Sequence, residues 1–166
     1  MKKRILSLSL SAVLLLVLLC ACGGPAAGGD ADVTINLNEL WDKITALGEM
    51  PMQMDVPDEF LADADNYGIN KDDLEDYIAK MPGMMVHATE FFIAKVKDGK
   101  IDDVKAALES RQAKLDAQWA LYLPDQYELV QNYKLTVNGS YIFFAISEYA
   151  EQAEQLFNDA IAAAKS

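Results

Sequence analysis

The residues that could do chemistry begin with two cysteines, Cys20 and Cys22, the only cysteines among 166 residues. They stand two apart at the end of a leucine-rich run, in the stretch LLCACGG. Such a pair could be a redox couple, a metal clip or a site of modification. A disulfide between cysteines this close would close a strained ring. Two thiolates without further Cys or His ligands nearby make a poor metal site, so the spacing favours modification.

The residues before the cysteines have the pattern of a secretory signal peptide. Three basic residues at 2–4 precede an apolar run over 5–19 that contains only serines as polar members. This run is shorter than the ~20 residues that a helix needs to cross the hydrocarbon core, and a Gly-rich stretch follows it in place of a basic flank. We therefore expect residues 1–21 to be a signal peptide and not a permanent membrane span.

The segment from Leu19 to Cys22 resembles the lipobox of bacterial lipoproteins. That motif has an aliphatic residue at position −3, a tolerant position −2, Gly, Ala or Ser at −1, and then the lipidated cysteine. Cys22 fits it, whereas Cys20 would follow Leu19, which is too large for position −1. We predict that Cys22 carries the acyl chains, such as palmitate, and that Cys20 is discarded. Each buried methylene adds about 0.8 kcal/mol of membrane affinity, so two or more chains give stable anchoring to a lipid bilayer.

A short tether and one domain are expected after the anchor. Residues 22–33 include GGPAAGGDAD, which is too poor in large apolar groups to pack and is typical of a flexible linker. The random-coil relation places the domain on the order of 20 Å from the bilayer. Residues 34–166 have the length of a single domain that can bury its own core.

The charge of the expected mature chain is strongly negative. Without the three basic residues of the signal peptide, eleven basic residues stand against twenty-six acidic ones, a net charge of −15. Such a surface repels nucleic acid and anionic lipid, which argues against both as ligands. It also keeps a tethered domain soluble.

The apolar patterns predict an α+β fold. We expect a first helix over 37–47 capped by Asn36, a short helix over 58–68, strands over 77–81 and 90–97, and a long helix from Ile101 to about Tyr122. A hairpin is predicted over 127–147 with Asn138-Gly139 as its turn, followed by a helix capped by Ser147. The order strand-strand-helix thus occurs twice after an N-terminal helix, which indicates an antiparallel sheet of about four strands packed with helices.

The hairpin suggests a candidate interaction face. Because side chains alternate along a strand, Leu135 and Val137 should share the helix-facing side with Ile142, Phe144 and Ile146. The opposite side, which is half polar, holds the following residues: Lys134, Thr136, Tyr141, Phe143 and Ala145. Either the first helix, with Trp41, covers this second side, or Tyr141, Phe143 and Lys134 lie open to a partner. We favour coverage, because it buries a helix stripe and a sheet patch together.

The remaining residues that could do chemistry form no convincing catalytic site or cofactor motif. His87 is the only histidine and has no nucleophile motif beside it. DADNYG (63–68) imitates the start of a calcium loop, but Leu74 stands where a bidentate Glu is needed. The abundant carboxylates show no spacing that selects a hydrolytic pair.

Two further features have alternative interpretations. Arg111 interrupts the apolar stripe of the long helix, so it could receive an anionic ligand or pair with one of the many acids. A methionine cluster could bind a soft metal or an apolar ligand, although adaptable core filling is the interpretation we favour. Its members are Met50, Met52, Met54, Met81, Met84 and Met85.

The whole pattern resembles a family of small bacterial lipoproteins, the domain of unknown function 4358. The likeness rests on YGINKDDLEDYIAKMPG, TEFFIAKVK and the long segment from ALESRQAKLD to the hairpin VNGSYIFFAIS. The resemblance implies an anchor and a fold but no activity, cofactor or catalytic residue. We expect a noncatalytic module of the cell envelope that binds an envelope protein, a peptide or a cell-wall component. The alternative hypothesis is a membrane-tethered hydrolase using carboxylates, which would require acids that converge in a pocket.

Overall fold

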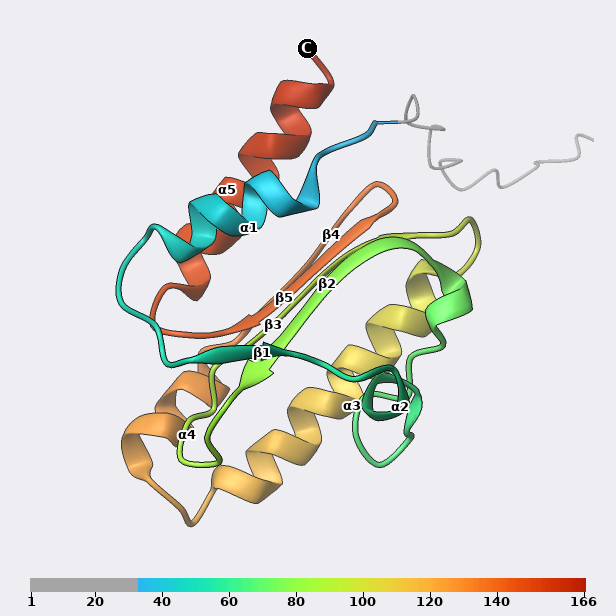
Figure 1. Cartoon of the computed structure of the whole chain (residues 1–166). Coiled ribbons are helices and arrows are strands. Elements are labelled where there is room, and N and C mark those ends of the chain that lie inside the picture. Colours follow the sequence, from blue (N-terminus) through green and yellow to red (C-terminus); the bar gives the residue numbers. More distant parts are fainter. Residues whose placement is uncertain (1–32) are drawn as a thin grey trace, which may run out of the picture.

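The computed structural model describes residues 33–166 (Figure 1). The predicted signal peptide, Cys20, Cys22 and all but the last residue of the predicted tether lie outside the described residues. Within 33–166, no helix is long and apolar enough to cross a membrane. The helices and strands follow in the order α1 (Leu37–Thr45), β1 (Gln53–Asp55), α2 (Asp58–Ala62), a 3-10 turn (Lys71–Asp73), β2 (Leu74–Pro82), β3 (Glu90–Val96), α3 (Ile101–Trp119), α4 (Pro124–Gln131), β4 (Lys134–Asn138), β5 (Tyr141–Ile146) and α5 (Ala150–Ala164).

The fold is α+β, with one antiparallel sheet packed with helices. The strand order is β1-β2-β3-β5-β4, so β5 lies in the interior of the sheet beside β3. The sequence predicted about four strands, and the described residues form five. The additional strand is β1, a three-residue segment that pairs with the end of β2, with Gln53 opposite Pro82.

The sheet lies between two helical layers (Figure 1). Helices α1 and α5 cover one face, and α2, α3 and α4 cover the other. All six residues of β5 are buried because their side chains alternate between the two cores. Residue 33 and the C-terminus both lie at the end of the molecule occupied by α1 and α5.

Local sequence explains how α1 begins and faces the sheet. The Asn36 side chain accepts hydrogen bonds from the backbone N–H groups of Asn38 and Glu39, as predicted for an N-cap. Leu37, Leu40 and Ile44 of α1 are buried against the sheet. On the other helix of this layer, Ala153, Phe157 and Ile161 are buried at helical spacing.

Three predicted features differ in the structure. Ser147 is not the N-cap of the last helix, because α5 begins at Ala150 and Tyr149 occupies the cap position. The first half of the predicted hairpin strand is helix α4, whose first residue is Pro124 and whose buried residue is Val130. The predicted helix over 58–68 is shorter, because α2 ends at Ala62 and a turn follows up to Gly68, which has a φ of +70°.

The hairpin turn is displaced from its predicted position, but the side-chain faces are not. Asn138 pairs with Tyr141, so Gly139 and Ser140 form the two-residue turn in place of Asn138-Gly139. Gly139 has a φ of +63°, which glycine adopts without steric cost. Val137 pairs with Ile142 and not with residue 140. This shift of two residues leaves each side chain on its predicted face.

Candidate functional site

The predicted interaction face of the hairpin is covered by α1 and α5. Tyr141 is 2% exposed and Phe143 is fully buried, and the Phe143 ring stacks on Phe157 of α5 at 5.3 Å between centroids. Lys134, half-buried, lies on the same side of β4. The open-face alternative is therefore corrected for the two aromatic residues, because helix packing buries them in the core.

Tyr141 also holds the first described residues of the chain. Its hydroxyl accepts a hydrogen bond from the Ile35 N–H at 3.1 Å and donates one to the Val33 carbonyl at 3.2 Å. The backbone just before α1 is thus fixed to β5 through one side chain. Any segment that precedes residue 33 leaves the domain from this point.

A buried polar cluster lies between α3, β3 and the turn after α2. Glu90, only 2% exposed, accepts a hydrogen bond from the Tyr67 hydroxyl at 2.8 Å. Arg111 donates two hydrogen bonds to the same carboxylate, from Nε at 3.1 Å and from Nη2. The guanidinium also lies 4.8 Å from the centre of the Tyr67 ring. We call Tyr67, Glu90 and Arg111 the buried triad.

The electrostatics of the buried triad keep Arg111 charged and Tyr67 neutral. Burial and the neighbouring Glu90 carboxylate raise the pKa of Tyr67 well above its usual value of 10.0. Burial lowers the pKa of Arg111, but the hydrogen bonds and charge of Glu90 outweigh this and raise it. Of the two interpretations of Arg111, the structure supports the ion pair, because a protein carboxylate occupies the place an anionic ligand would take.

The carboxylates of the described residues do not assemble a hydrolytic pair. Glu90 is the only acidic residue of 33–166 that is buried, and both of its oxygens are bonded within the buried triad. A glycosidase-type mechanism needs two carboxyl groups facing one substrate. His87, half-buried, lies in the loop between β2 and β3, where its backbone N–H donates to the Met84 carbonyl. The geometry therefore gives the hydrolase hypothesis no specific support.

The segment 63–68, which resembles the start of a calcium loop, is a turn stabilised by its own side chains. Both Asp63 carboxylate oxygens accept hydrogen bonds, one from the Asp65 N–H and one from the Asn66 side chain. Among residues 33–166 no group of three or more acidic, His or Cys side chains could hold a metal ion.

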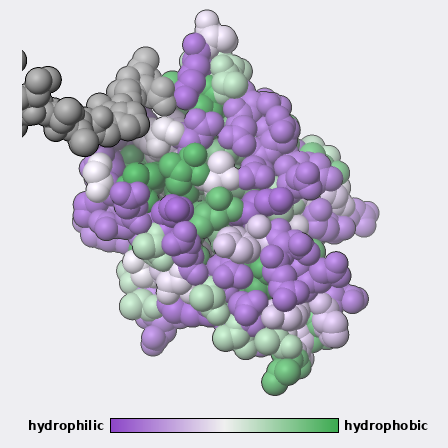
Figure 2. Space-filling view, turned by 180° about the vertical axis from the view of Figure 1, so that it is seen from behind, coloured by the Kyte–Doolittle hydropathy of each residue, from purple (hydrophilic) through white to green (hydrophobic). Residues whose placement is uncertain are grey.

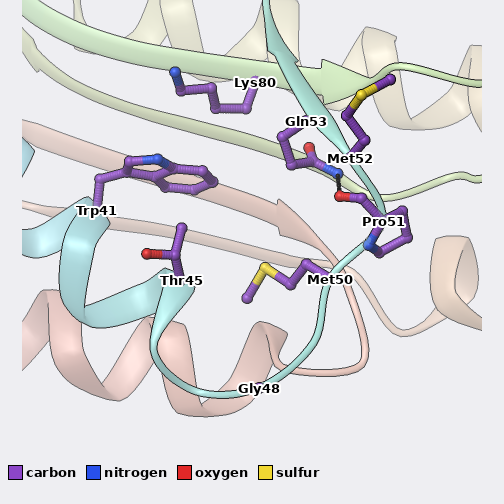
Figure 3. A pocket seen from close by; sticks show the side chains of 8 residues that line it. All are labelled: Trp41, Thr45, Gly48, Met50, Pro51, Met52, Gln53 and Lys80. Carbon is purple, nitrogen blue, oxygen red and sulfur yellow. Dashed lines mark hydrogen bonds between the residues drawn. The ribbon is translucent and has the colours of Figure 1, made fainter.

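A groove lies beside the edge strand β1, between α1 and the end of β2 (Figure 3). Its volume is about 330 Å³, and its lining combines an indole ring, methionines, an amide and a lysine. The lining residues are Trp41, Thr45, Gly48, Met50, Pro51, Met52, Gln53 and Lys80. The side chains of α1 and the segment 50–53 face one another across this groove.

The polar groups of the groove are unevenly satisfied. The Gln53 side-chain N–H donates to the Pro51 carbonyl at 3.0 Å, while its Oε1 is buried and lacks a hydrogen-bond partner within the described residues. Lys80 pairs with Asp55 and places its ammonium 5.6 Å from the centre of the Trp41 ring. A buried acceptor without a donor costs free energy, so a ligand N–H or O–H that reached Gln53 would recover that cost.

Core filling, which the sequence favoured for the methionine cluster, holds only for Met50 and Met81, which are half-buried and pack against the cores. Four of its six members are exposed: Met52 (66%), Met54 (46%), Met84 (52%) and Met85 (88%). Met52 precedes β1, Met54 lies in it, and Met84 and Met85 lie in the loop after β2. The Gly83 N–H donates to the Met52 carbonyl at 2.8 Å, which joins the two segments. Flexible, polarisable methionines suit adaptable apolar binding surfaces. The groove thus continues into an exposed apolar border.

The family model described as Domain of unknown function (DUF4358) matches residues 48–147. The chain belongs to this family. No curated protein and no solved structure matches it. The DUF4358 match contains all five strands and the layer of α2, α3 and α4, whereas α1 and α5 lie outside it. One side of the groove, from Gly48 to Lys80, therefore lies within the DUF4358 match, and the other side, formed by α1, lies outside it.

Sequence reasoning missed the groove of this DUF4358 protein because β1 gives no periodic signal. Three residues are too few to show alternation, and the flanking Pro51 and Pro57 are typical of a connector. The one feature of the sequence that could have indicated the groove was the cluster of methionines around Gln53. It predicted adaptable packing but not which methionines would be exposed.

Proposed function

We propose that this protein is an extracytoplasmic lipoprotein, anchored in the cell membrane through acylated Cys22, whose domain is a noncatalytic binding module of the cell envelope. Its ligand is an envelope protein, a peptide or a cell-wall component that enters the groove beside β1. Nucleic acid is not expected as a ligand, because the acidic surface repels it.

The lipobox-like segment LCAC supports the anchor. The GGPAAGGDAD stretch that follows is succeeded directly by Val33 and Ile35, whose backbone groups are hydrogen-bonded to Tyr141. The predicted tether therefore joins the domain at a point that is fixed to the sheet. The family resemblance points to the same location and adds no activity.

The groove is the observation that carries the binding function. It is large enough for a peptide side chain or a sugar ring, and it offers an aromatic ring, apolar methionines and an unsatisfied acceptor at Gln53. Binding sites commonly combine an apolar lining with a few polar groups that orient the ligand. The carboxylates of residues 33–166, by contrast, are exposed or half-buried, except that of Glu90, which is buried and bonded within the protein.

The anchor is tested by matched serine variants of the two cysteines. In cells fed an alkyne-labelled palmitate analogue, Cys22→Ser should lose the label and leave the membrane fraction. Cys20→Ser should keep both, because position −2 of a lipobox tolerates many residues. Full membrane retention of the Cys22→Ser form, without label, would refute the lipoprotein assignment.

The groove is tested by a photoreactive residue on α1. Benzoylphenylalanine at Thr45, which is exposed and lines the groove, should crosslink to the ligand on intact cells. The same residue at Lys43, which is exposed on α1 but does not line the groove, is the matched control. Mass spectrometry of the adducts then names the ligand. Equal adducts at both positions, or none at Thr45, would contradict the groove as the binding site.

A further inference from the structure

A run of exposed apolar residues forms the turn between α3 and α4. All five residues of the segment 120–124, Ala-Leu-Tyr-Leu-Pro, are exposed, and we call this segment the ALYLP turn. Leu121 is 101% exposed, Tyr122 52% and Leu123 39%. Exposed apolar runs of this kind mark interaction surfaces or sites of aggregation.

The ALYLP turn is fixed in a strained conformation. Leu123 has a φ of +46°, a region that disfavours residues with a branched or bulky side chain. The strain is held by flanking hydrogen bonds, because the Leu123 carbonyl accepts from the N–H groups of Gln126 and Tyr127 at 2.9 and 3.0 Å. The Tyr122 ring packs on Trp119 at 5.6 Å between centroids. Strained backbone that the surrounding structure enforces is concentrated at binding sites.

The side chain beneath the turn is also unusual. Trp119 is 3% exposed, yet its indole N–H has no acceptor within the described residues. The turn and the residue before it therefore combine an unsatisfied donor, a strained residue and a fully exposed leucine within positions 119–123. A turn selected only for its role as a connector would need none of the three.

The ALYLP turn lies at the end of the molecule opposite to residue 33 and the C-terminus (Figure 1). Figure 2 shows a strongly hydrophobic projection at the same lower end. The loop that carries exposed Met84 and Met85 approaches this end, since the Ala88 N–H donates to the Gln126 side chain at 2.9 Å. The apolar projection thus faces away from the point where the chain leaves the domain.

The charges around the turn select one kind of partner. No Lys or Arg occurs between residues 115 and 133, whereas Asp116, Asp125 and Glu128 do. An acidic border of this kind repels anionic lipid and also a second copy of this chain, which carries the same border. It complements a protein surface with an apolar pocket surrounded by Lys and Arg.

We infer that the ALYLP turn is a second interaction site, which inserts Leu121 and Tyr122 into an apolar pocket with a basic rim on a protein partner. A rigid turn loses little conformational freedom on binding, which favours affinity. This inference requires neither lipidation of Cys22 nor a ligand in the groove, so it fails or holds independently of the proposed function.

The test places benzoylphenylalanine at Leu121 of the full chain in its own cells, with Ala113, an exposed residue of α3, as the control position. We expect one protein adduct at Leu121 and not at Ala113, with the adduct mapped to an apolar pocket beside Lys or Arg. Affinity for that purified partner should fall about tenfold or more in Leu121→Ser and Tyr122→Ser, and not in Ala113→Ser. Association should slow as the salt concentration rises.

Several outcomes would overturn the inference. These are adducts with lipid, adducts only between two copies of this chain, the same adducts at both positions, or no adduct above background. A partner whose affinity is unchanged by Leu121→Ser would also overturn it. Loss of folding does not confuse the result, because Leu121 buries no surface and thermal melting of the variant should match that of the natural chain.

Discussion

Removal of one member of the Glu90–Arg111 ion pair should destabilise the fold far more than replacement of both. Arg111→Met deletes two hydrogen bonds to a carboxylate whose side chain is only 3% exposed. Glu90 then keeps one bond, from the Tyr67 hydroxyl. Glu90→Leu leaves the opposite problem, a buried guanidinium without its anion. The double variant Glu90→Leu with Arg111→Met removes both charges.

The magnitudes follow from the burial of the pair. Stranding one charge of a buried pair costs about 3–5 kcal/mol, whereas replacing the whole pair by apolar groups of similar size is about neutral. The two single variants should therefore sum to about 6–10 kcal/mol of lost stability. The double variant should lose less than about 2 kcal/mol, which gives a coupling of several kcal/mol between the two positions.

Urea unfolding, followed by tryptophan fluorescence at pH 7, measures these differences. With an m-value of about 2 kcal/mol/M, each single variant should lower the unfolding midpoint by about 2 M. The exposed pair of Lys71 with Asp58 is the matched control, since its loss should change the midpoint little. A coupling below about 1 kcal/mol, with the double variant as unstable as the sum of the single ones, would refute our account of the buried triad.

Three further predictions concern single side chains. Because the pKa of Tyr67 is raised in the folded state, the unfolded chain loses the hydroxyl proton first as the pH rises. The contribution of Tyr67 to stability is therefore complete below about pH 10 and is lost as the pH rises towards the folded pKa. Tyr67→Phe should flatten the fall in urea midpoints between pH 9 and 11, and an unchanged slope would disprove this. Gly48→Ala should cost about 1–3 kcal/mol because a Cβ there would lie 2.2 Å from the Tyr149 hydroxyl oxygen; Tyr149→Ala should remove most of that cost, and melting temperatures that do not respond to the second change would contradict the clash. Tyr141→Phe should speed hydrogen exchange at the Ile35 amide and cost about 1 kcal/mol; protection as strong as in the natural chain would show that another group holds this segment.

The fold class was predictable from the sequence because its signals are periodic. Alternation along β5 assigned Tyr141 and Phe143 to one face and Ile142 and Phe144 to the other, and the structure confirms this. The position of the turn was less certain, since Asn138 and Ser140 both suit a tight turn beside Gly139. A shift of two residues in the pairing leaves every side chain on its predicted face of the sheet, so the assignment of residues to the two cores stayed correct.

Helix α4 shows where periodicity is ambiguous. Tyr127, Leu129 and Tyr133 alternate as in a strand, but Val130 and Tyr127 also have helical spacing. Packing of Val130 against the core decides for the helix. The partner of Arg111 was likewise beyond prediction, because Glu90 is one of twenty-six acidic residues and begins a strand where an exposed side chain is ordinary.

The placement of residue 33 and the C-terminus at one end of the molecule has a practical consequence for imaging and purification. A fluorescent protein joined after Ser166 would extend from the α1 and α5 layer. It would leave the ALYLP turn at the opposite end unobstructed. A reporter attached there can therefore follow the protein in cells without competing with the partner that we infer for that turn.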